Sequence, residues 1–575
     1  MAEVETSTVQ AEAEQAVPPA CPVLMHGGAP CGRPLYKADF PGDKRNVCLM
    51  HTHDPNKDDA AFQEEFERIL KEAGEGTADF SYFVFPKAQY GDREFRAECI
   101  FSWAKFMGAT LFSKARFAMP VSFGGCEFKQ PVSFWKAEFS GEANLRGCKF
   151  GSDIEFTETV FSGALYLSQS VFERGVTFLK ARFLAKAILG GVQFSGFARF
   201  QDSTFEIRAS FNDASFAEWC DFSLATFKGA ADFNGVSFSK GVGFVGATFG
   251  KQVYFVGTTF GDPTDFSTTS FCGLANFTTS EFLGRVKFDE TWFQREENGA
   301  EGPVFSKAQF HRPEGVLFHN TYLGRALFSE CDVSRFVFTE VKWLRRHQGG
   351  RRMVFEEAVS LREVLVGGLG SGMKHSDERN YALIAELYQQ LKKNYDAKCD
   401  YWTAGDFHYG EMEMKRLSSP RQNKVLRWLH RNFGLVAWYK YASEYGESYV
   451  RPALWMAAVV LIFALLYPLA GLSPSERQVK VAAQPTAGYE DVKESVNSYA
   501  TILQCVRTEP GRVGPRARDV MGHSLMTTLG VAFFQRDLDY QPSYPWGRVL
   551  QWVELLLTSS LIALFLLAVR RQFRR

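Results

Sequence analysis

Three cysteines and a histidine near the N-terminus have the types and spacing of metal ligands. Within CPVLMHGGAPCGRPLYKADFPGDKRNVCLMHTHD, Cys48 and His51 form a Cys-x-x-His pair, which one tight turn can present to a tetrahedral ion. Cys21 and Cys31 can complete the set with two further thiolates. A zinc ion would then have all four positions filled by protein. Such a closed site would be structural rather than catalytic.

The stretch that carries these ligands, residues 21–55, has too few apolar side chains to fold alone. Bound metal would therefore supply folding free energy. His26 and His53 are spare ligand candidates, and the alternative is an unstructured segment with unrelated thiols. Residues 1–20, which precede it, are acidic and lack an apolar run, so we interpret them as a disordered tail and not as a secretory signal.

No constellation for catalysis stands out elsewhere in the chain. Paired carboxylates, a nucleophile with its base and a cofactor-binding loop are all missing from the pattern. The glycine-rich GGLGSG follows no strand pattern and lacks the Lys-Ser/Thr ending of a phosphate-binding loop. We therefore expect this protein not to be an enzyme.

An alternation of five- and six-residue steps organises the chain from Phe95 to Phe293. It marks 37 positions, of which 34 are Phe and three are Leu, at 145, 167 and 189. A mean step of 5.5 residues fits neither an α-helix nor an exposed strand. It does fit a four-sided coil of 22 residues, whose successive turns stack at about 4.8 Å with the marked side chains inside. The three leucines, 22 residues apart, should then stack on one face.

Small residues stand two positions before most marks, as at Ala104, Ala115, Ala214 and Ala247, where they would fill the corners. Cys126 and Cys148 occupy this position in adjacent coils, and we expect them to be thiols. The pattern resembles the A-x-F-x-x and A-[DN]-L-x-x units of the pentapeptide-repeat family. The resemblance covers residues 80–340 and implies a right-handed quadrilateral β-helix, an all-β solenoid, over 78–340. It departs from the family by an extra residue in every second side. The Cys…Cys…Cys-x-x-His segment also resembles a knuckle that precedes some such rods.

Charge restricts what the rod could bind. The chain holds 65 Lys and Arg against 65 Asp and Glu, and residues 95–293 hold 19 of each. Some pentapeptide-repeat proteins are acidic rods thought to mimic DNA, but duplex DNA carries one negative charge per about 1.7 Å. A neutral rod fits neither mimicry of DNA nor binding along it. We expect no nucleic-acid partner.

Helical patterns flank the rod. Phe62, Phe66, Ile69 and Leu70 have helical spacing, so we predict a helix within 56–76 that caps the first coil. After the rod, 341–375 reads as a transition and glycine-rich linker, and 376–445 as a helical coupler, in which residues 376–416 form two helices. The basic and aromatic residues that follow are typical of a segment on an anionic membrane surface.

The last part, residues 446–575, reads as a membrane domain. The runs 453–472 and 549–569 are long enough to span a bilayer. Arg570, Arg571 and their neighbours, with Lys440 and Arg451 before the first span, favour a cytoplasmic location for both ends. We therefore expect a multi-pass protein of the cell inner membrane, in contact with lipid, whose loop 473–548 lies outside.

Residues 528–532 of the same part, Thr-Leu-Gly-Val-Ala, stand where the potassium-channel superfamily has Thr-Val-Gly-Tyr-Gly, so this part resembles, in a degenerate form, the two-span subunits of that family. The resemblance implies a homotetrameric cation pore of altered selectivity, because an alanine and a valine replace two filter residues. Glu554 lies inside a span, where a carboxylate usually faces a bundle interior or a water-filled path. The alternative is that both spans anchor a cytoplasmic scaffold, which binds an unknown protein and conducts nothing. The pore residues implied are Thr528, Leu529, Gly530, Val531, Ala532 and Glu554.

Overall fold

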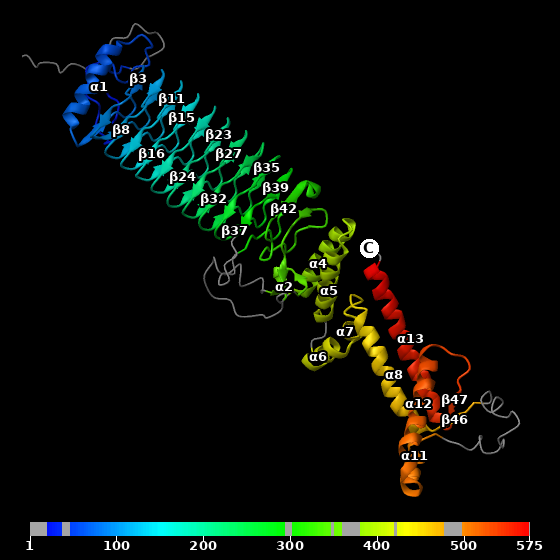
Figure 1. Ribbon diagram of the computed structural model, residues 1–575. Coiled ribbons are helices and arrows are strands. Elements are labelled where there is room, and N and C mark those ends of the chain that lie inside the picture. The colour runs from blue at the N-terminus through cyan, green and yellow to red at the C-terminus, as the bar shows by residue number, and fades with distance from the viewer. Residues whose placement is uncertain are drawn as a thin grey trace, which may run out of the picture. The chain divides into compact units, whose positions relative to one another are not determined.

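The computed structural model describes residues 20–36, 46–293, 302–346, 350–358, 380–418, 423–475 and 497–573, in two units that divide after Arg379. The first unit is a parallel β-solenoid (Figure 1). Its strands run from β1 (Thr77–Asp79) to β43 (Val337–Thr339). From β1 to β36 (Ser270–Phe271), each pairs with the strand four positions further along the chain, and this spacing changes in the last coils. Four sheets of 10, 11, 12 and 10 strands result, so about 12 coils are stacked.

Strand register confirms the 22-residue coil. Glu127 and Phe128 of β10 (Glu127–Phe128) pair with Lys149 and Phe150 of β14 (Lys149–Phe150), and the same offset recurs along the rod. The marked side chains point inward and stack as columns. Phe200, fully buried, lies 4.8 Å from the ring of Phe178 and 4.7 Å from that of Phe222. In this column, one stacked pair of rings therefore joins each coil to the next.

The leucine column is also confirmed. Leu145, Leu167 and Leu189 are fully buried, and each follows a strand of one sheet: β13 (Ala143–Asn144), β17 (Leu165–Tyr166) and β21 (Ala187–Ile188). These strands are neighbours in the order β9-β13-β17-β21-β25. The period of the sequence thus reports the stacking even where the residue type changes.

The corner positions before the marks are filled by small buried side chains, including the four alanines named above. Ser203 donates to the carbonyl of Phe200 in its own coil, but at several other polar corner residues the hydroxyl or thiol donates to the carbonyl oxygen 25 residues earlier. Cys126 and Cys148 do so at 2.9 and 3.1 Å, to Phe101 and Phe123, and both are free thiols. The other members are Thr159, Ser170, Thr258, Thr269, Ser280 and Thr291. These bonds tie successive coils together.

The extra residue of the six-residue sides bends against the preceding coil, and glycine often stands there. A Cβ added at Gly229 would lie 2.2 Å from the carbonyl oxygen of Ile207. At Gly163 it would lie 2.1 Å from that of Gly141. The departure from strict pentapeptides is therefore absorbed by close backbone contact between coils, which only a residue without Cβ permits at these points.

Both ends of the solenoid are covered. Helix α1 (Asp59–Ala73) begins at the N-cap Asp58, and its Phe66 stacks on Phe80 of the first coil at 4.5 Å. At the other end, part of the predicted linker is folded. Strands β44 (Leu344–Arg345) and β45 (Arg352–Met353) pair antiparallel, and α2 (Phe355–Ala358) packs Phe355 against the last coils. The prediction for 341–375 named a transition before its glycine-rich linker, and it is in this transition that Phe355 and the buried Glu356 close the open end. The GGLGSG stretch and the predicted tail 1–19 lie outside the described residues.

The second unit is helical. Its first four helices are α4 (Tyr381–Ala397), α5 (Tyr401–Leu417), α6 (Lys424–Phe433) and α7 (Leu435–Ser443). Helices α4 and α5 correspond to the two helices expected over 376–416, and α6 and α7 follow them. Buried Glu413 joins α5 to the end of α7. Burial alone would raise the pKa of Glu413, but hydrogen bonds from Arg416, Lys440 and Tyr445 outweigh it and lower that pKa to about 2.

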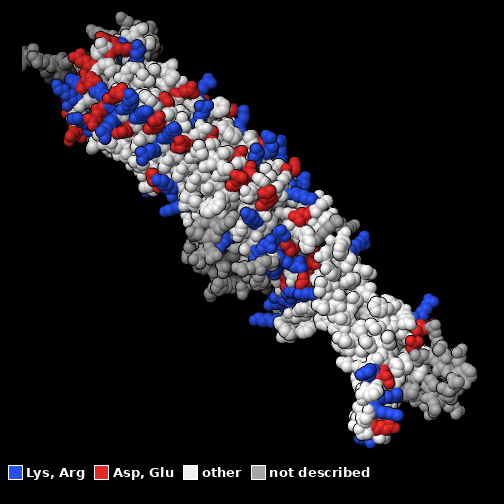
Figure 2. Space-filling view, viewed as in Figure 1, with Lys and Arg blue, Asp and Glu red and all other residues white. Residues whose placement is uncertain are grey.

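Two helices of this unit are long and apolar enough to cross a membrane: α8 (Val450–Ala470) and α13 (Pro545–Phe573). They run antiparallel. Strand β46 (Leu472–Pro474), after α8, pairs with β47 (Tyr540–Pro542), before α13, while Arg571 near the end of α13 donates to the carbonyl of Tyr445 at 3.0 Å. Figure 2 shows mixed charges along the visible face of the β-helix and a mainly uncharged surface around α8 and α13. Between them in sequence lie α11 (Tyr499–Thr508) and α12 (Val513–Ala532).

Candidate metal centre and apolar helix pair

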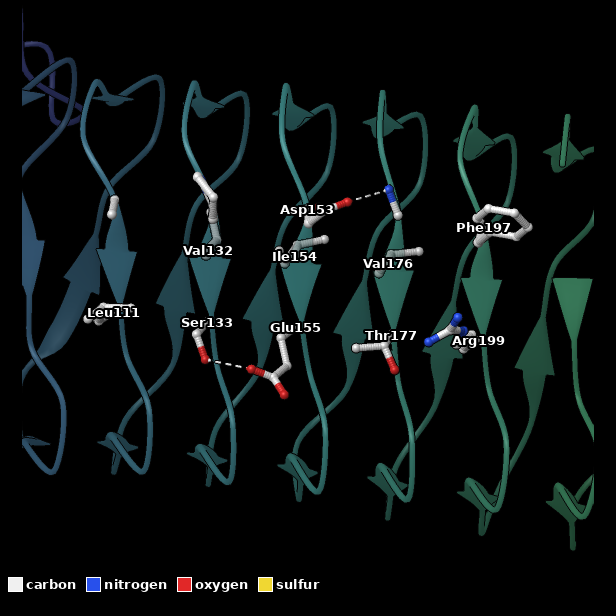
Figure 3. Close-up of a pocket in the computed structure, with 13 residues that line it drawn as sticks. Leu111, Val132, Ser133, Asp153, Ile154, Glu155, Val176, Thr177, Phe197 and Arg199 are labelled. Atoms are coloured by element: carbon white, nitrogen blue, oxygen red, sulfur yellow. Dashed lines mark hydrogen bonds between the residues drawn. The ribbon is translucent and has the colours of Figure 1, made fainter. Parts of the chain in front are cut away.

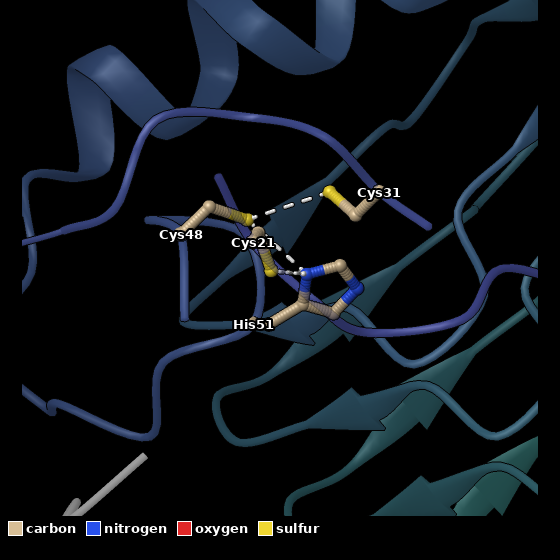
Figure 4. A group of neighbouring side chains, drawn as sticks. All are labelled: Cys21, Cys31, Cys48 and His51. Atoms are coloured by element: carbon tan, nitrogen blue, oxygen red, sulfur yellow. Dashed lines mark hydrogen bonds between the residues drawn. The ribbon is translucent and has the colours of Figure 1, made fainter. Parts of the chain in front are cut away.

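The four predicted metal ligands meet in space. The ligand atoms of Cys21, Cys31, Cys48 and His51 all lie within 4.8 Å of one another (Figure 4). The sulfurs of Cys31 and Cys48 are 3.7 Å apart, and Nδ1 of His51 lies 3.1 Å from the Cys48 sulfur and 3.5 Å from that of Cys21. Zinc–sulfur bonds of about 2.3 Å at tetrahedral angles place two sulfurs about 3.8 Å apart. The arrangement therefore fits a zinc ion.

The surroundings of the ligands fit a metal as well. Nε2 of His51 donates to the carbonyl of Ser81 at 3.3 Å, which leaves Nδ1 as the atom that can coordinate. Arg33 donates to the sulfur of Cys31 at 3.2 Å and forms an ion pair with Glu65 of α1 at 2.6 Å. The hydrogen bond from Cys48 lowers the pKa of the Cys31 thiol well below its ordinary value, with help from Arg33.

The metal centre also joins three parts of the unit. Its ligands come from the loops before α1, Arg33 reaches α1, and His51 packs edge-on against Phe83 of the first coil at 5.1 Å. Spacing could not reveal Arg33 or Ser81 as supporting groups, because their contacts with the ligands form only in the folded chain. Among the spare candidates, the backbone of His26 donates to Asp79. An ion here would fasten the N-terminal loops to the start of the rod.

The predicted filter residues do not form an extended filter. Thr528, Leu529, Gly530, Val531 and Ala532 occupy the last turn of α12. The carbonyls of Leu529, Gly530 and Val531 accept hydrogen bonds from the backbone of residues 533, 535 and 534 at 3.0, 2.8 and 3.2 Å. A filter requires carbonyls that are free to face an ion. That part of the resemblance was wrong, because a degenerate five-residue match carries no information on where its backbone groups bond.

Glu554 is fully buried in the helix pair. One of its carboxylate oxygens accepts a hydrogen bond from the hydroxyl of Tyr467 on α8 at 2.5 Å. Its other oxygen has no hydrogen-bond partner among the described residues. Helix α12 lies beside α8, since Ser524 donates to the carbonyl of Ala464 at 2.6 Å. Burial of a carboxylate between two apolar helices costs free energy, so a carboxylate at such a place usually has a role in helix packing or in transport.

A shallow groove of about 490 Å³ lies on the outer face of the sheet that contains β7 (Thr110–Leu111) and β23 (Ala198–Arg199). Figure 3 shows two rows of side chains across it, with Phe197 at one end. Ser133 donates to Glu155 at 3.1 Å, and Asp153 accepts from the backbone of Gly175 at 2.9 Å. Because these polar groups satisfy one another, the groove offers shape and apolar contact more than unpaired charge.

Comparison with known proteins identifies the repeat. A family model described as pentapeptide repeats (9 copies) matches residues 101–149 and 222–270. Two solved structures of QnrB1, a plasmid-mediated fluoroquinolone resistance protein, are similar to part of the chain. A trypsin-treated variant is 17% identical over 37% of this chain and 93% of that one, with a TM-score of 0.15. The full-length form is 13% identical over 42% and 93%, with a TM-score of 0.13.

No curated protein matches the chain. The family match covers two segments of the rod, and the same 22-residue register runs through both of them and between them. Phe128 pairs with Phe150 in the first region and Phe227 with Phe249 in the second. The β-solenoid of this chain is therefore built from pentapeptide repeats.

Proposed function

We propose that this protein is a membrane-anchored interaction scaffold. Its β-helix would be the binding element, α8 and α13 the anchor, and a protein the partner. One observation carries the proposal: both helices of the antiparallel pair turn large apolar side chains outward. On α8 these are Leu454, Leu461, Ile462, Leu465 and Leu469, and on α13 they are Val549, Trp552, Leu556, Leu566 and Leu567. Lipid is the medium that removes such surface from water.

The direction of insertion follows from charge. Arg570 and Arg571 end α13, and Lys440 and Arg451 lie by the start of α8, at the same end of the pair. The positive-inside rule would place this end, and both chain termini, in the cytoplasm of a cell whose inner membrane holds the pair. The rod would then be cytoplasmic, where its buried cysteines stay reduced.

The rod itself suits binding rather than catalysis. Its outer charges pair between neighbouring coils, as Arg116 does with Glu138 and Lys228 with Glu206, at 3.3 and 2.9 Å. A neutral surface of this kind does not attract nucleic acid. A zinc ion at the metal centre would be structural: it would hold the loops before α1 against the first coil and complete the end of the rod.

Replacement of the helices tests the proposal. The residues of α8 and α13 are exchanged for unrelated apolar helices of equal length. Alkaline carbonate extraction and photo-crosslinking from the rod are then compared with the wild-type chain. We expect the exchanged chain to remain in the membrane pellet and to give the same crosslinked partners. A wild-type chain that carbonate extracts into the supernatant, or that lacks crosslinked partners, would contradict the scaffold.

A second candidate, a homotetrameric cation pore, is favoured by Glu554 alone. Its buried carboxylate, with one oxygen unpaired among the described residues, is the kind of group that lines an ion path. Single-channel recording from purified chain in liposomes tests it. A pore predicts current that Glu554→Gln alters and that the exposed-site control Leu556→Ala leaves unchanged. Wild-type liposomes without current would leave the scaffold as the function.

A further inference from the structure

Helix α6 is strongly amphipathic. Its apolar residues lie on one side at steps of three and four, and basic residues lie on the other. In a water-soluble domain, the apolar side of such a helix packs on the core and the charged side faces solvent. The apolar residues of α6 are Val425, Leu426, Trp428, Leu429 and Phe433.

In this protein the helix is turned the other way. Arg431 faces the unit: its guanidinium donates to the carbonyl of Leu417 at 2.6 Å and lies over the ring of Tyr381, 5.6 Å from the centroid. Arg416 donates in turn to the carbonyl of Arg431. The apolar side points away from the protein, and no residue of α6 is buried. Trp428 is 57% exposed.

The outward apolar surface continues into α7, where Leu435 is 88% exposed and Trp438 is 60% exposed. It ends at the start of α8, because the indole of Trp455 donates to the carbonyl of Tyr441 at 3.2 Å. We call this surface, residues 424–441, the α6–α7 face. Lys424 and Arg427 are basic side chains of this face, Arg431 and Lys440 bond within the unit, and residues 424–441 contain no acidic residue. Tryptophan and tyrosine beside a span are typical of the membrane boundary.

We infer that the α6–α7 face lies in the headgroup boundary of an anionic lipid bilayer, with its apolar side chains among the upper acyl chains. This inference rests on the proposed membrane anchor. Continuity with α8 and the excess of basic residues favour lipid over a second copy of the chain or a protein partner. Lys424 and Arg427, which flank the apolar side, reach anionic headgroups. The face thereby fixes the first helices of the unit against the membrane surface.

Thiol labelling in lipid nanodiscs tests the inference with the full chain. Leu429→Cys replaces an apolar residue that is 42% exposed, so we expect the variant to fold like the wild type. Its reaction with a water-soluble maleimide is followed by peptide mass spectrometry in discs that hold one chain each. Native Cys399, exposed in the same unit, is the internal control. We expect position 429 to react at least about tenfold more slowly than Cys399 in discs with phosphatidylglycerol.

The charge requirement has its own variant. Lys424→Glu with Arg427→Glu should return the labelling rate at 429 toward that of Cys399, while the chain stays in the disc. Protection that occurs only in discs with two chains would assign the face to a second copy and overturn the lipid assignment. A chain that enters discs but labels at 429 as fast as at Cys399 would overturn this inference alone. A chain that does not enter discs would overturn the membrane anchor and this inference with it.

Discussion

Truncation of Phe200 to alanine should open the rod locally. The side chain is fully buried between the rings of Phe178 and Phe222, and Phe194 and Phe211 meet it edge-on at 6.2 and 5.5 Å. Loss of a buried phenylalanine costs about 3–5 kcal/mol. The upper half of that range applies, because the hydrogen-bonded register of the coils prevents collapse around the cavity and four aromatic contacts disappear. We therefore expect Phe200→Ala to lower the opening free energy of the neighbouring coils by about 4 kcal/mol.

Hydrogen exchange measured by mass spectrometry suits this prediction, since a chain of two units does not unfold in one step. In a solenoid, each coil contacts only its neighbours, so the change should stay local. A loss of about 4 kcal/mol in opening free energy corresponds to exchange about 10³-fold faster. We expect this acceleration in peptides within residues 178–222 and little change within 95–128.

The matched control is Phe197→Ala. Phe197 is three residues away but 53% exposed on the groove. Its removal should change exchange by less than about tenfold, as for most surface substitutions. If Phe200→Ala accelerates exchange in 178–222 no more than Phe197→Ala does, the columns of aromatic rings do not stabilise the coils as argued here.

Three further perturbations follow from the structure. Cys48→Ala with His51→Ala should remove about one zinc per chain by elemental analysis, and wild type prepared without chelator that holds no zinc would contradict the site. Burial raises the pKa of Glu356 to about 7, so the fold favours its protonated form. The terminal coils should therefore be most stable below pH 4.5, and their opening free energy should fall by up to about 3 kcal/mol as pH rises to about 7. Hydrogen exchange measured as a function of pH should show this dependence in the wild type and not in Glu356→Gln. Gly229→Ala should destabilise its coil by about 2 kcal/mol in the same assay, because the added Cβ would lie 2.2 Å from a carbonyl oxygen. The control is Lys228→Ala at an exposed position, which should change the stability of the coil by less than about 0.5 kcal/mol.

The rod was predictable because one period governs its coils from Phe95 to Phe293, whereas the offset departs from 22 in the last coils, as between Val286 and Val316. Each marked residue repeats the same local choice, so Leu145, Leu167 and Leu189 could be assigned to a column from their spacing alone, and the structure places them there. The metal ligands could be chosen for a related reason: cysteines are few and a Cys-x-x-His turn is short. Arg33 and the carbonyl of Ser81 could not, because they reach the ligands through the fold and not through spacing.

The helical unit was less predictable since tertiary contacts decide its details. Thr528 to Ala532 resemble a filter in sequence only, since carbonyls of this segment accept backbone hydrogen bonds at the end of α12. The folded end at β44, β45 and α2 could not be predicted because it lies beyond the repeat, so no period marks its strands. The pattern of α6 shows two faces but does not say which of them meets the protein. The ion pair and backbone contacts of Arg416 and Arg431 determine that choice.

The alternation of five and six residues also determines which insertions and deletions leave the faces of the rod unchanged. Insertion or deletion of one whole coil, 22 residues in the pairing between Phe128 and Phe150, leaves every side chain on its original face and changes the length by about 4.8 Å. The loss of half a coil, one five-residue side and one six-residue side, would also preserve the inward columns. It would, however, rotate everything beyond that point by half a turn about the rod axis and exchange opposite faces. Lineages of this protein could therefore vary the rod's reach in whole coils without disturbing a binding face, whereas half-coil changes would move that face to the opposite side.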